Sequence, residues 1–396
     1  MQSQSQFSVL LTETETETKM SGIYIHIPFC KQACHYCDFH FSTSLKKKDE
    51  MVAALANEIA MRKDEFKDEV VETIYFGGGT PSILQIADLR WLIDAVFKHY
   101  KVVDEPEITV EANPDDLSEE RIIALSQNKI NRLSIGIQSF FEDDLKLMNR
   151  AHNVAEAKKC LEIATKYFDN ITIDLIYGMP EMSREKWLQN IQTALSFNIP
   201  HISSYALTVE PKTALHQFIQ KGVIQPLDDD LAQEHFHLLV DTLEEHGFVH
   251  YELSNFGKEG YFSKNNSSYW LGKKYLGIGP SAHSYDGEKR GWNVANNSLY
   301  LKSLANNELP IEIETLTKTD RYNEYIMTGL RTIWGVSLDR IETEFGPKYF
   351  EYLIRQSDKY IEDHLLFIDD NILRTTKRGK FLSDGIASDL FLLNLE

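Results

Sequence analysis

Cysteines are few in this sequence, long hydrophobic runs are missing, and acidic residues outnumber basic ones. With 4 cysteines among 396 residues, the chain cannot rely on a disulfide framework. No apolar stretch approaches the roughly 18 residues that cross a bilayer, so we expect a cytoplasmic protein without a transmembrane segment. The formal net charge of −19 argues against a nucleic-acid binder, which needs a basic face.

The first 20 residues differ in composition from the rest of the sequence. Their apolar piece, residues 7–11, is too short for a signal peptide and lacks a basic flank. The Thr-Glu repeat after it is polar and of low complexity, so we expect residues 1–20 to form a disordered leader. Regular sequence begins directly after Met20, which we therefore expect to be the true start.

Short β-branched runs alternate with helical patterns up to residue 250. The predicted strands are 22–29, 71–76, 107–111, 132–137, 171–176 and 202–208. The predicted helices are 47–64, 85–99, 118–128, 154–167, 184–197 and 228–246. Such alternation is typical of an α/β fold with a parallel sheet.

The unusual polar residues follow the ends of these strands. Cysteines follow the first strand, a glycine run follows the second, Glu111 ends the third, Gln138 follows the fourth and Asp174 lies in the fifth. In parallel α/β barrels the site forms at the carboxyl ends of the strands. We therefore predict a partial six-stranded barrel over residues 21–250, with its site at that rim.

The sequence pattern changes after residue 250. Residues 251–317 are rich in Gly, Asn, Ser and aromatics, which predicts an irregular extension packed on the barrel. Helical patterns return at 321–334, 338–345 and 349–363, and a β-hairpin is predicted around Asp369-Asp370-Asn371. Residues 318–396 thus form a helical module with a small wing. They hold 11 Lys and Arg against 14 Asp and Glu, a net of −3, which is the wrong sign for a phosphate-binding wing.

Three cysteines lie within eight residues, in the pattern Cys30-X3-Cys34-X2-Cys37. In a reducing cytosol such spacing indicates metal. An iron–sulfur cube normally takes four thiolates, one on each iron, so three leave one iron open. An open position can coordinate a small molecule, as the amino and carboxylate groups of S-adenosylmethionine do in radical-SAM chemistry. We predict a [4Fe–4S] cluster with this cofactor.

A structural zinc site is the alternative, completed by His26, His35 or His40. Zinc sites usually show two Cys/His pairs with a longer spacer between them, and that spacing is missing here. Cys160 lies inside an amphipathic helical pattern, so we expect a buried core residue and not a fourth ligand.

The run of residues 77–81, Gly-Gly-Gly-Thr-Pro, suits a ligand that approaches the backbone closely. It contains no Lys, so it is no Walker loop, and its glycines leave N–H and C=O groups accessible. Glu111 and Asp174 suit ribose hydroxyls or ammonium groups, or else a cap or an ion pair. Arg150 could clamp a carboxylate, and Gln138 could hydrogen-bond ribose or adenine. A surface salt bridge and simple strand-end polarity are their alternatives.

A further glycine run, Gly277-Ile-Gly279-Pro280, superficially resembles a dinucleotide-binding fingerprint. It lacks a preceding βαβ setting, and Pro280 interrupts it. We expect no nucleotide there.

Several of these motifs together resemble one family, the oxygen-independent coproporphyrinogen III oxidase-like radical-SAM proteins. The motifs are Ile23-Tyr24-Ile25-His26-Ile27-Pro28-Phe29-Cys30 and residues 77–81, 111–114, 134–140 and 174–180. The resemblance spans about residues 22–385 and implies a partial (β/α)6 barrel followed by a winged-helix-like C-terminal domain. It implies that S-adenosylmethionine is bound by Tyr24, Gly78, Gly79, Thr80, Glu111, Gln138, Arg150 and Asp174, with Phe39 beside the cluster.

The family has an oxidase branch and a haem-chaperone branch. The oxidase branch has another cysteine two residues after the third ligand, where this chain has Phe39. Residues 205–211, 250–256 and 275–279 resemble the chaperone branch, which binds haem and passes it to acceptor proteins. We therefore expect haem, acceptor proteins with respiratory ones among the candidates, an electron donor for the cluster, and peripheral contact with a membrane during delivery. The oxidative decarboxylase stays the alternative, and no catalytic residue is assigned.

The chain departs from the chaperone pattern at one position. A His-Asn-X2-Tyr-Trp segment is associated with haem in that branch, whereas this chain has Asn265-Asn266-Ser-Ser-Tyr269-Trp270. Asn is no normal haem-iron ligand, so His250 and His283 become the nearby candidates. The porphyrin surface is expected among the aromatics and lysines of 251–285, or these aromatics merely pack the extension onto the barrel. They are Tyr251, Phe256, Tyr261, Phe262, Tyr269, Trp270 and Tyr275, with Lys264, Lys273 and Lys274.

Overall fold

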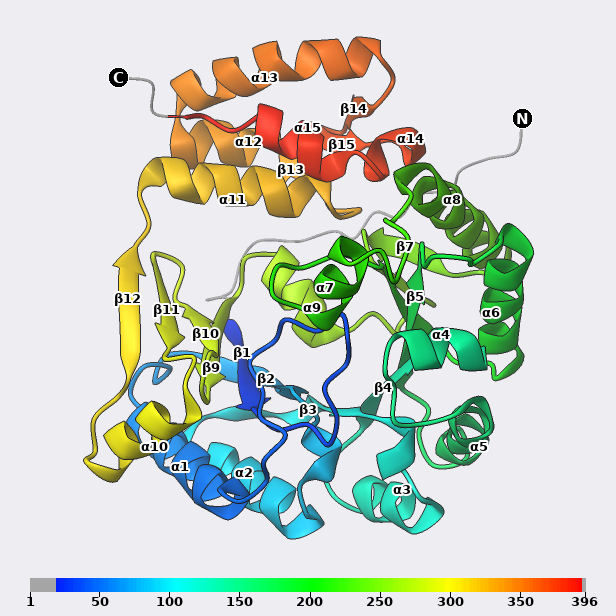
Figure 1. Ribbon diagram of the computed structural model, residues 1–396. Coiled ribbons are helices and arrows are strands. Elements are labelled where there is room, and N and C mark those ends of the chain that lie inside the picture. Colours follow the sequence, from blue (N-terminus) through cyan, green and yellow to red (C-terminus); the bar gives the residue numbers. More distant parts are fainter. Residues whose placement is uncertain (1–18, 394–396) are drawn as a thin grey trace.

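A computed structural model describes residues 19–393 of the chain. Six parallel strands form the centre of the molecule (Figure 1). The strands neighbour one another in chain order. Their middles are almost continuously buried, as in the Ile171–Tyr177 strand, because helices cover parallel sheets and both strand faces must be apolar. The strands are β1 (Met20–Ile27), β2 (Val70–Gly78), β3 (Val102–Ala112), β4 (Arg132–Gln138), β5 (Ile171–Tyr177) and β6 (His201–Ala206).

The helices that connect these strands pack on the outside of the sheet, and two further helices follow β6 (Figure 1). Each turns its apolar stripe inward, and Leu89, Leu92, Ile93 and Val96 of α2 are buried in this way. The predicted α/β class and partial barrel are confirmed. The helices are α1 (Lys48–Met61), α2 (Ile86–His99), α3 (Glu119–Ser126), α4 (Glu142–Leu147), α5 (Val154–Ala164), α6 (Arg184–Ser196), α7 (Ala214–Gln220) and α8 (Asp229–Glu245).

The stretch after residue 250 packs onto the barrel, as expected, and also adds strands to both edges of its sheet. Strand β9 pairs in parallel with β1, and β8 pairs antiparallel with β6. The described sheet therefore has 12 strands. The added elements are β7 (Val249–Glu252), β8 (Asn255–Gly257), α9 (Lys264–Trp270), β9 (Lys274–Ile278), β10 (His283–Tyr285), β11 (Lys289–Asn293), α10 (Asn297–Ala305) and β12 (Ile311–Thr315).

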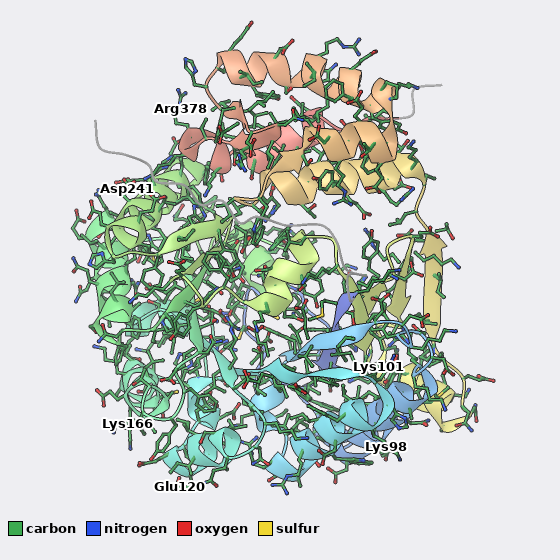
Figure 2. The ribbon with its side chains drawn as sticks, turned by 180° about the vertical axis from the view of Figure 1, so that it is seen from behind. Lys98, Lys101, Glu120, Lys166, Asp241 and Arg378 are labelled. Atoms are coloured by element: carbon green, nitrogen blue, oxygen red, sulfur yellow. The ribbon has the colours of Figure 1, made fainter. Side chains whose placement is uncertain are left out.

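The C-terminal part has its own hydrophobic core, which supports the proposed division near residue 318. The predicted hairpin is confirmed, and Asp370 and Asn371 at its tip have φ of 49° and 60°, as a two-residue type I′ turn requires. Lys377 of α14 pairs with Asp241 of α8 at 2.6 Å at the junction with the barrel, and Figure 2 labels Asp241 there. The elements are α11 (Lys318–Leu330), β13 (Val336–Ser337), α12 (Leu338–Arg340), η3 (Ile341–Phe345), α13 (Pro347–Glu362), β14 (Leu366–Asp369), β15 (Ile372–Thr375), α14 (Lys377–Lys380) and α15 (Ser383–Asp389).

Within residues 19–393, no helix has the length and apolar character to cross a membrane.

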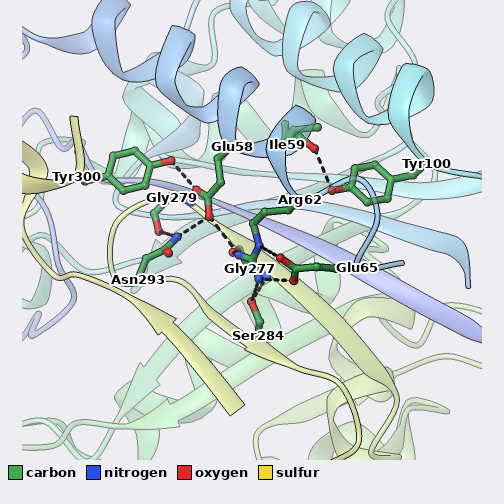
Figure 3. Close-up of polar contacts among 10 residues, drawn as sticks. All are labelled: Glu58, Ile59, Arg62, Glu65, Tyr100, Gly277, Gly279, Ser284, Asn293 and Tyr300. Carbon is green, nitrogen blue, oxygen red and sulfur yellow. Dashed lines mark hydrogen bonds and ion pairs between the residues drawn. The ribbon is translucent and has the colours of Figure 1, made fainter. Parts of the chain in front are cut away.

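A buried carboxylate joins the extension to the barrel (Figure 3). Glu58 on α1 is fully buried and accepts hydrogen bonds from the Gly279 N–H at 2.8 Å, the Asn293 amide at 2.7 Å and the Tyr300 hydroxyl at 2.6 Å. Arg62, 2% exposed, pairs with Glu58 at 3.1 Å and donates to the Gly277 carbonyl at 2.8 Å. The glycine run that resembled a nucleotide fingerprint is thus a structural contact with α1.

Replacing Glu58 with alanine should lower the free energy of unfolding by about 3–5 kcal/mol, because removing one partner of a buried ion pair leaves the other uncompensated. The measurement is urea unfolding followed by circular dichroism. The matched control is Glu65→Ala, since Glu65 also pairs with Arg62 but is 44% exposed; it should cost at most about 1 kcal/mol. Equal losses from both variants would contradict this account.

Candidate functional site

The three clustered cysteines lie in the loop between β1 and α1, at the carboxyl end of β1. Backbone hydrogen bonds fix this loop: Cys30 N–H donates to Ser42 C=O at 3.1 Å, and His35 N–H donates to Met148 C=O at 3.1 Å. All three thiols are free and partly exposed. Two of them accept hydrogen bonds, Cys30 Sγ from the Thr80 hydroxyl at 3.5 Å and Cys34 Sγ from Arg150 Nη1 at 3.3 Å.

The chemistry of these thiols fits a metal cluster. Burial raises the pKa of Cys37 to about 12 and also raises the pKa of Cys30, so both thiols hold their protons at neutral pH. A coordinated metal replaces that proton outright. The donors from Thr80 and Arg150 are placed to stabilise the resulting thiolates.

The geometry gives little support to the zinc alternative. Among residues 19–393, no three His, Cys, Asp or Glu side chains come together around a single ion, whereas a cube takes each thiolate on a different iron. The three histidines are bonded elsewhere. His26 Nε2 donates to His40 C=O at 2.9 Å, His35 Nδ1 to Leu147 C=O at 2.8 Å, and His40 Nε2 lies 2.8 Å from Asn297 Oδ1.

The glycine run at the end of β2 must be glycine for steric reasons. Gly78 has φ of +105°, and a Cβ there would lie 2.4 Å from the His26 ring. A Cβ on Gly79 would lie 2.5 Å from the Phe29 carbonyl oxygen. The Thr80 N–H donates to that same carbonyl at 2.7 Å. The run is therefore locked against the end of β1, directly beside the cysteine loop.

Two carboxylates face the space between the strand ends. Glu111 accepts from the Tyr75 hydroxyl at 2.8 Å and from the Gly78 N–H at 3.2 Å, and burial raises its pKa. Burial, and next the nearby charge of Glu111, raise the pKa of Asp174 to about 7. Two carboxylates in one poorly hydrated site favour a cationic ligand, and S-adenosylmethionine carries a sulfonium and an ammonium group.

Arg150 links the cysteine loop to β4. Besides Cys34, it donates through Nη2 to Asn113 Oδ1 at 2.6 Å and to the Gly136 carbonyl at 2.8 Å. Its buried Nε has no partner within the described residues. Gln138 has φ of 68° at the end of β4, and a Cβ on Gly136 would lie 2.9 Å from its amide nitrogen.

One pocket, which we call the rim pocket, brings most of the predicted residues together. It is lined by Cys30, Cys34, Cys37, Phe39, Gly78, Gly79, Thr80, Glu111, Gln138, Arg150 and Asp174. Phe39 is 67% exposed, at its outer edge. Sequence reasoning gave no role to six further lining residues, although Ser134 and Gly136 share the strand periodicity of Gln138. The six are Gln32, Tyr36, Ala112, Asn113, Ser134 and Gly136.

Tyr24 lies outside the rim pocket, in a deeper polar space that we call the inner cavity. Glu111, Ser134 and Asp174 line both spaces. The Tyr24 hydroxyl donates to His26 Nδ1 at 3.2 Å, since Nε2 of that ring carries the proton given to His40 C=O. The inner cavity was not predicted, because its walls come from strands and loops far apart in sequence. They include Arg132, Thr172, His201, Ser203, Tyr205, Asn255, Asn265 and Tyr269.

The candidate haem ligands have different surroundings. Asn265 is buried, and its Oδ1 accepts from the Thr73 hydroxyl at 3.1 Å. His250 is also buried, stacked on Phe256 at 4.2 Å and bonded through Nε2 to Leu253 C=O at 3.0 Å. These contacts indicate a structural role for His250 in the packing of the core. His283 is exposed on β10.

Five of the seven aromatics expected at the porphyrin surface fall into two groups. Tyr251 and Phe256 are fully buried and pack the extension onto the barrel. Tyr269, Trp270 and Tyr275 instead line a space facing the C-terminal part.

Comparison with known proteins places this geometry in a family. Residues 24–194 match the Radical SAM superfamily, and residues 316–382 match the HemN C-terminal domain. A solved structure of coproporphyrinogen III oxidase (HemN) from Escherichia coli, a radical SAM enzyme, superposes with a TM-score of 0.83. It covers 94% of this chain and 90% of that one at 22% identity, which shows a shared fold.

The matched domain and the fold thus define the chain as a radical SAM protein, and relatives of higher identity narrow the class. A heme chaperone HemW from Bacillus subtilis is 34% identical over 371 residues, 93% of this chain and 98% of that one. HemW from Mycobacterium tuberculosis is 32% identical over 93% and 94% of the two chains. A mouse protein, radical S-adenosyl methionine domain-containing protein 1, mitochondrial, is 30% identical over 95% and 88%. The chain belongs to the HemW family of the radical SAM superfamily.

After anaerobic reconstitution the protein should hold about four irons and four sulfides per chain. Cys30→Ala, Cys34→Ala and Cys37→Ala should each lose most of this iron, measured by a colorimetric iron assay. Cys160→Ala is the matched control, because Cys160 is 2% exposed within the core, and it should keep the cluster. Stoichiometric zinc with no iron in the wild type would rule the cluster out.

Affinity for S-adenosylmethionine should rise with pH. Asp174 has a raised pKa of about 7, so it is neutral below that pH and ionised above it, and only the ionised form attracts a cation. If binding needs that form, affinity increases about tenfold between about pH 6 and pH 8, as calorimetry on the clustered protein can measure. Asp174→Asn should bind weakly without this slope and should keep its iron. The same slope in the variant would assign the titration to another group.

Proposed function

We propose that this chain is a haem chaperone that holds a [4Fe–4S] cluster on Cys30, Cys34 and Cys37 and binds S-adenosylmethionine beside it. The observation that carries the proposal is the rim pocket, where the three thiols meet a glycine run and two carboxylates. The naming of the relatives as heme chaperones over almost their whole length supports the haem function.

The roles of the side chains follow from their contacts. Cluster and cofactor, when bound, supply one-electron chemistry. Thr80 and Arg150 donate to the cysteine sulfurs, while Gly78 and Gly79 leave room for a ligand against the backbone. Glu111 and Asp174 balance the positive charges of the cofactor.

The remaining residues of the site complete its walls. Gln138 at the end of β4 is placed to hydrogen-bond ribose or adenine. Phe39 covers the outer edge of the rim pocket. Tyr24 contributes from the inner cavity, on the far side of the carboxylates.

The partners and location belong to the same proposal. An electron donor would approach the cysteine loop, where the thiols are partly exposed. Haem would pass to acceptor proteins, respiratory ones among them, from a cytoplasmic protein that touches the membrane only peripherally during delivery.

The oxidative decarboxylation of porphyrinogen propionates is the weaker candidate. Its support is the fold shared with HemN. Phe39 stands where the oxidase branch has a further cysteine, and the closer relatives carry the chaperone name.

The wild type should take up haem saturably under anaerobic conditions, in a titration followed by absorbance. With reductant and S-adenosylmethionine it should form no decarboxylated product from coproporphyrinogen III, as liquid chromatography can measure. An oxidase of the same fold serves as the positive control for the product assay. Multiple turnovers of coproporphyrinogen III would place the chain in the oxidase branch instead.

A further inference from the structure

A cavity of about 390 Å³ lies between the extension and the C-terminal part, a size typical of small-molecule sites. We call it the aromatic cavity. Helix α9 and strands β9 and β10 form one side, and α11 with the segment up to Phe345 forms the other. Six aromatic side chains line it: Tyr269, Trp270, Tyr275, Tyr285, Tyr325 and Phe345.

The aromatic walls suit a large flat ring. Tyr269 meets Tyr275 edge to face, with ring centroids 4.5 Å apart, and Tyr325 is stacked near Phe345 at 6.4 Å. Aromatic walls supply much apolar contact area and prefer offset or edge-on ring partners.

The cavity also holds three guanidinium groups and two carboxylates. Arg290 is paired with Glu324. Arg321 and Arg340 share the single carboxylate of Glu344, at 3.4 Å and 2.9 Å. Each of these two arginines donates one N–H there, through Nη1 and Nε respectively.

A guanidinium carries five N–H donors, so Arg321 and Arg340 keep donors for further oxygens. Paired donors of this kind match carboxylates in geometry and charge. The ligand that fits is a broad apolar ring carrying carboxylates at its edge.

We propose that the aromatic cavity binds haem, with the ring against the aromatic walls and the propionates on Arg321 and Arg340. This assignment rests on the proposed haem function. No histidine is among the described residues that line the cavity. Of the side chains there, the phenols and the thioether of Met327 belong to the types that ligate haem iron.

The position of the cavity fits this use. Tyr269 lines both the aromatic cavity and the inner cavity. The inner cavity in turn shares Glu111 and Asp174 with the rim pocket. Haem in this cavity would therefore be one tyrosine away from the space beside the cofactor.

The test combines two probes with two variants of the anaerobically reconstituted full chain. The probes are haem and haem dimethyl ester, which lacks the propionate charges. The variants are the double substitution Arg321→Gln with Arg340→Gln and a control, Arg355→Gln with Arg378→Gln, at two exposed arginines of the same part of the chain. Iron content and S-adenosylmethionine affinity check that each variant is folded.

The wild type and the control should bind haem roughly ten- to a hundredfold more tightly than the ester, the range for hydrogen bonds to charged groups. The Arg321/Arg340 variant should bind haem as weakly as the wild type binds the ester. Its affinity for the ester should equal that of the wild type. Equal affinities of the wild type for haem and ester, or haem affinity untouched in the Arg321/Arg340 variant, would overturn the site and leave the chaperone function standing. A wild type that takes up no haem at all would overturn both.

Discussion

The buried charge of Glu58 is the constraint on which the arrangement of the cavities depends. An ionised carboxylate without exposure is stable only when its oxygens are saturated with donors. Arg62 supplies one donor from the barrel, and Gly279, Asn293 and Tyr300 supply the others from the extension (Figure 3). The hydrogen bonds to the Glu58 carboxylate therefore hold β9 beside β1. They also fix the position of the extension just after α9. Helix α9 closes the inner cavity with Tyr269, so the network on one side of the sheet sets the walls of the site on the other.

The rim pocket could be predicted from the sequence because its residues are local to strand ends. Cys30 follows β1, Gly78 ends β2, Glu111 lies near the end of β3, and parallel pairing in chain order brings those ends together. The strands of the extension were beyond such reasoning, since β8 and β10 have three residues each, too few for a period-2 pattern. Their places are decided by long-range pairing, because β8 pairs with β6, while β10 pairs with β9, which in turn pairs with β1.

The inner cavity was beyond prediction for a related reason. Arg132, His201, Asn255 and Tyr269 converge there from four elements, and nothing in their own segments shows that they meet. Arg132 is 2% exposed and donates to the Thr172 hydroxyl, which no local pattern signals. The role of Arg150 was anticipated as a clamp for a carboxylate, whereas the structure also bonds it to Cys34. When a side chain is long enough to reach several partners, the surrounding tertiary structure determines which of them it contacts.

The rim pocket and the aromatic cavity carry charged groups of opposite sign, so each favours a different kind of ligand. Glu111 and Asp174 make the rim pocket favourable for a cation, while the spare donors of Arg321 and Arg340 make the aromatic cavity favourable for an anion. The inner cavity separates them and touches both, through the two carboxylates on one side and Tyr269 on the other. A ligand in the aromatic cavity would contact Tyr269, which also forms part of the wall of the inner cavity. By linkage, any effect of the cofactor on haem affinity must then be matched by an equal effect of haem on cofactor affinity. A protein that must both hold and release haem gains from such coupling, because filling one site then sets the affinity of the other.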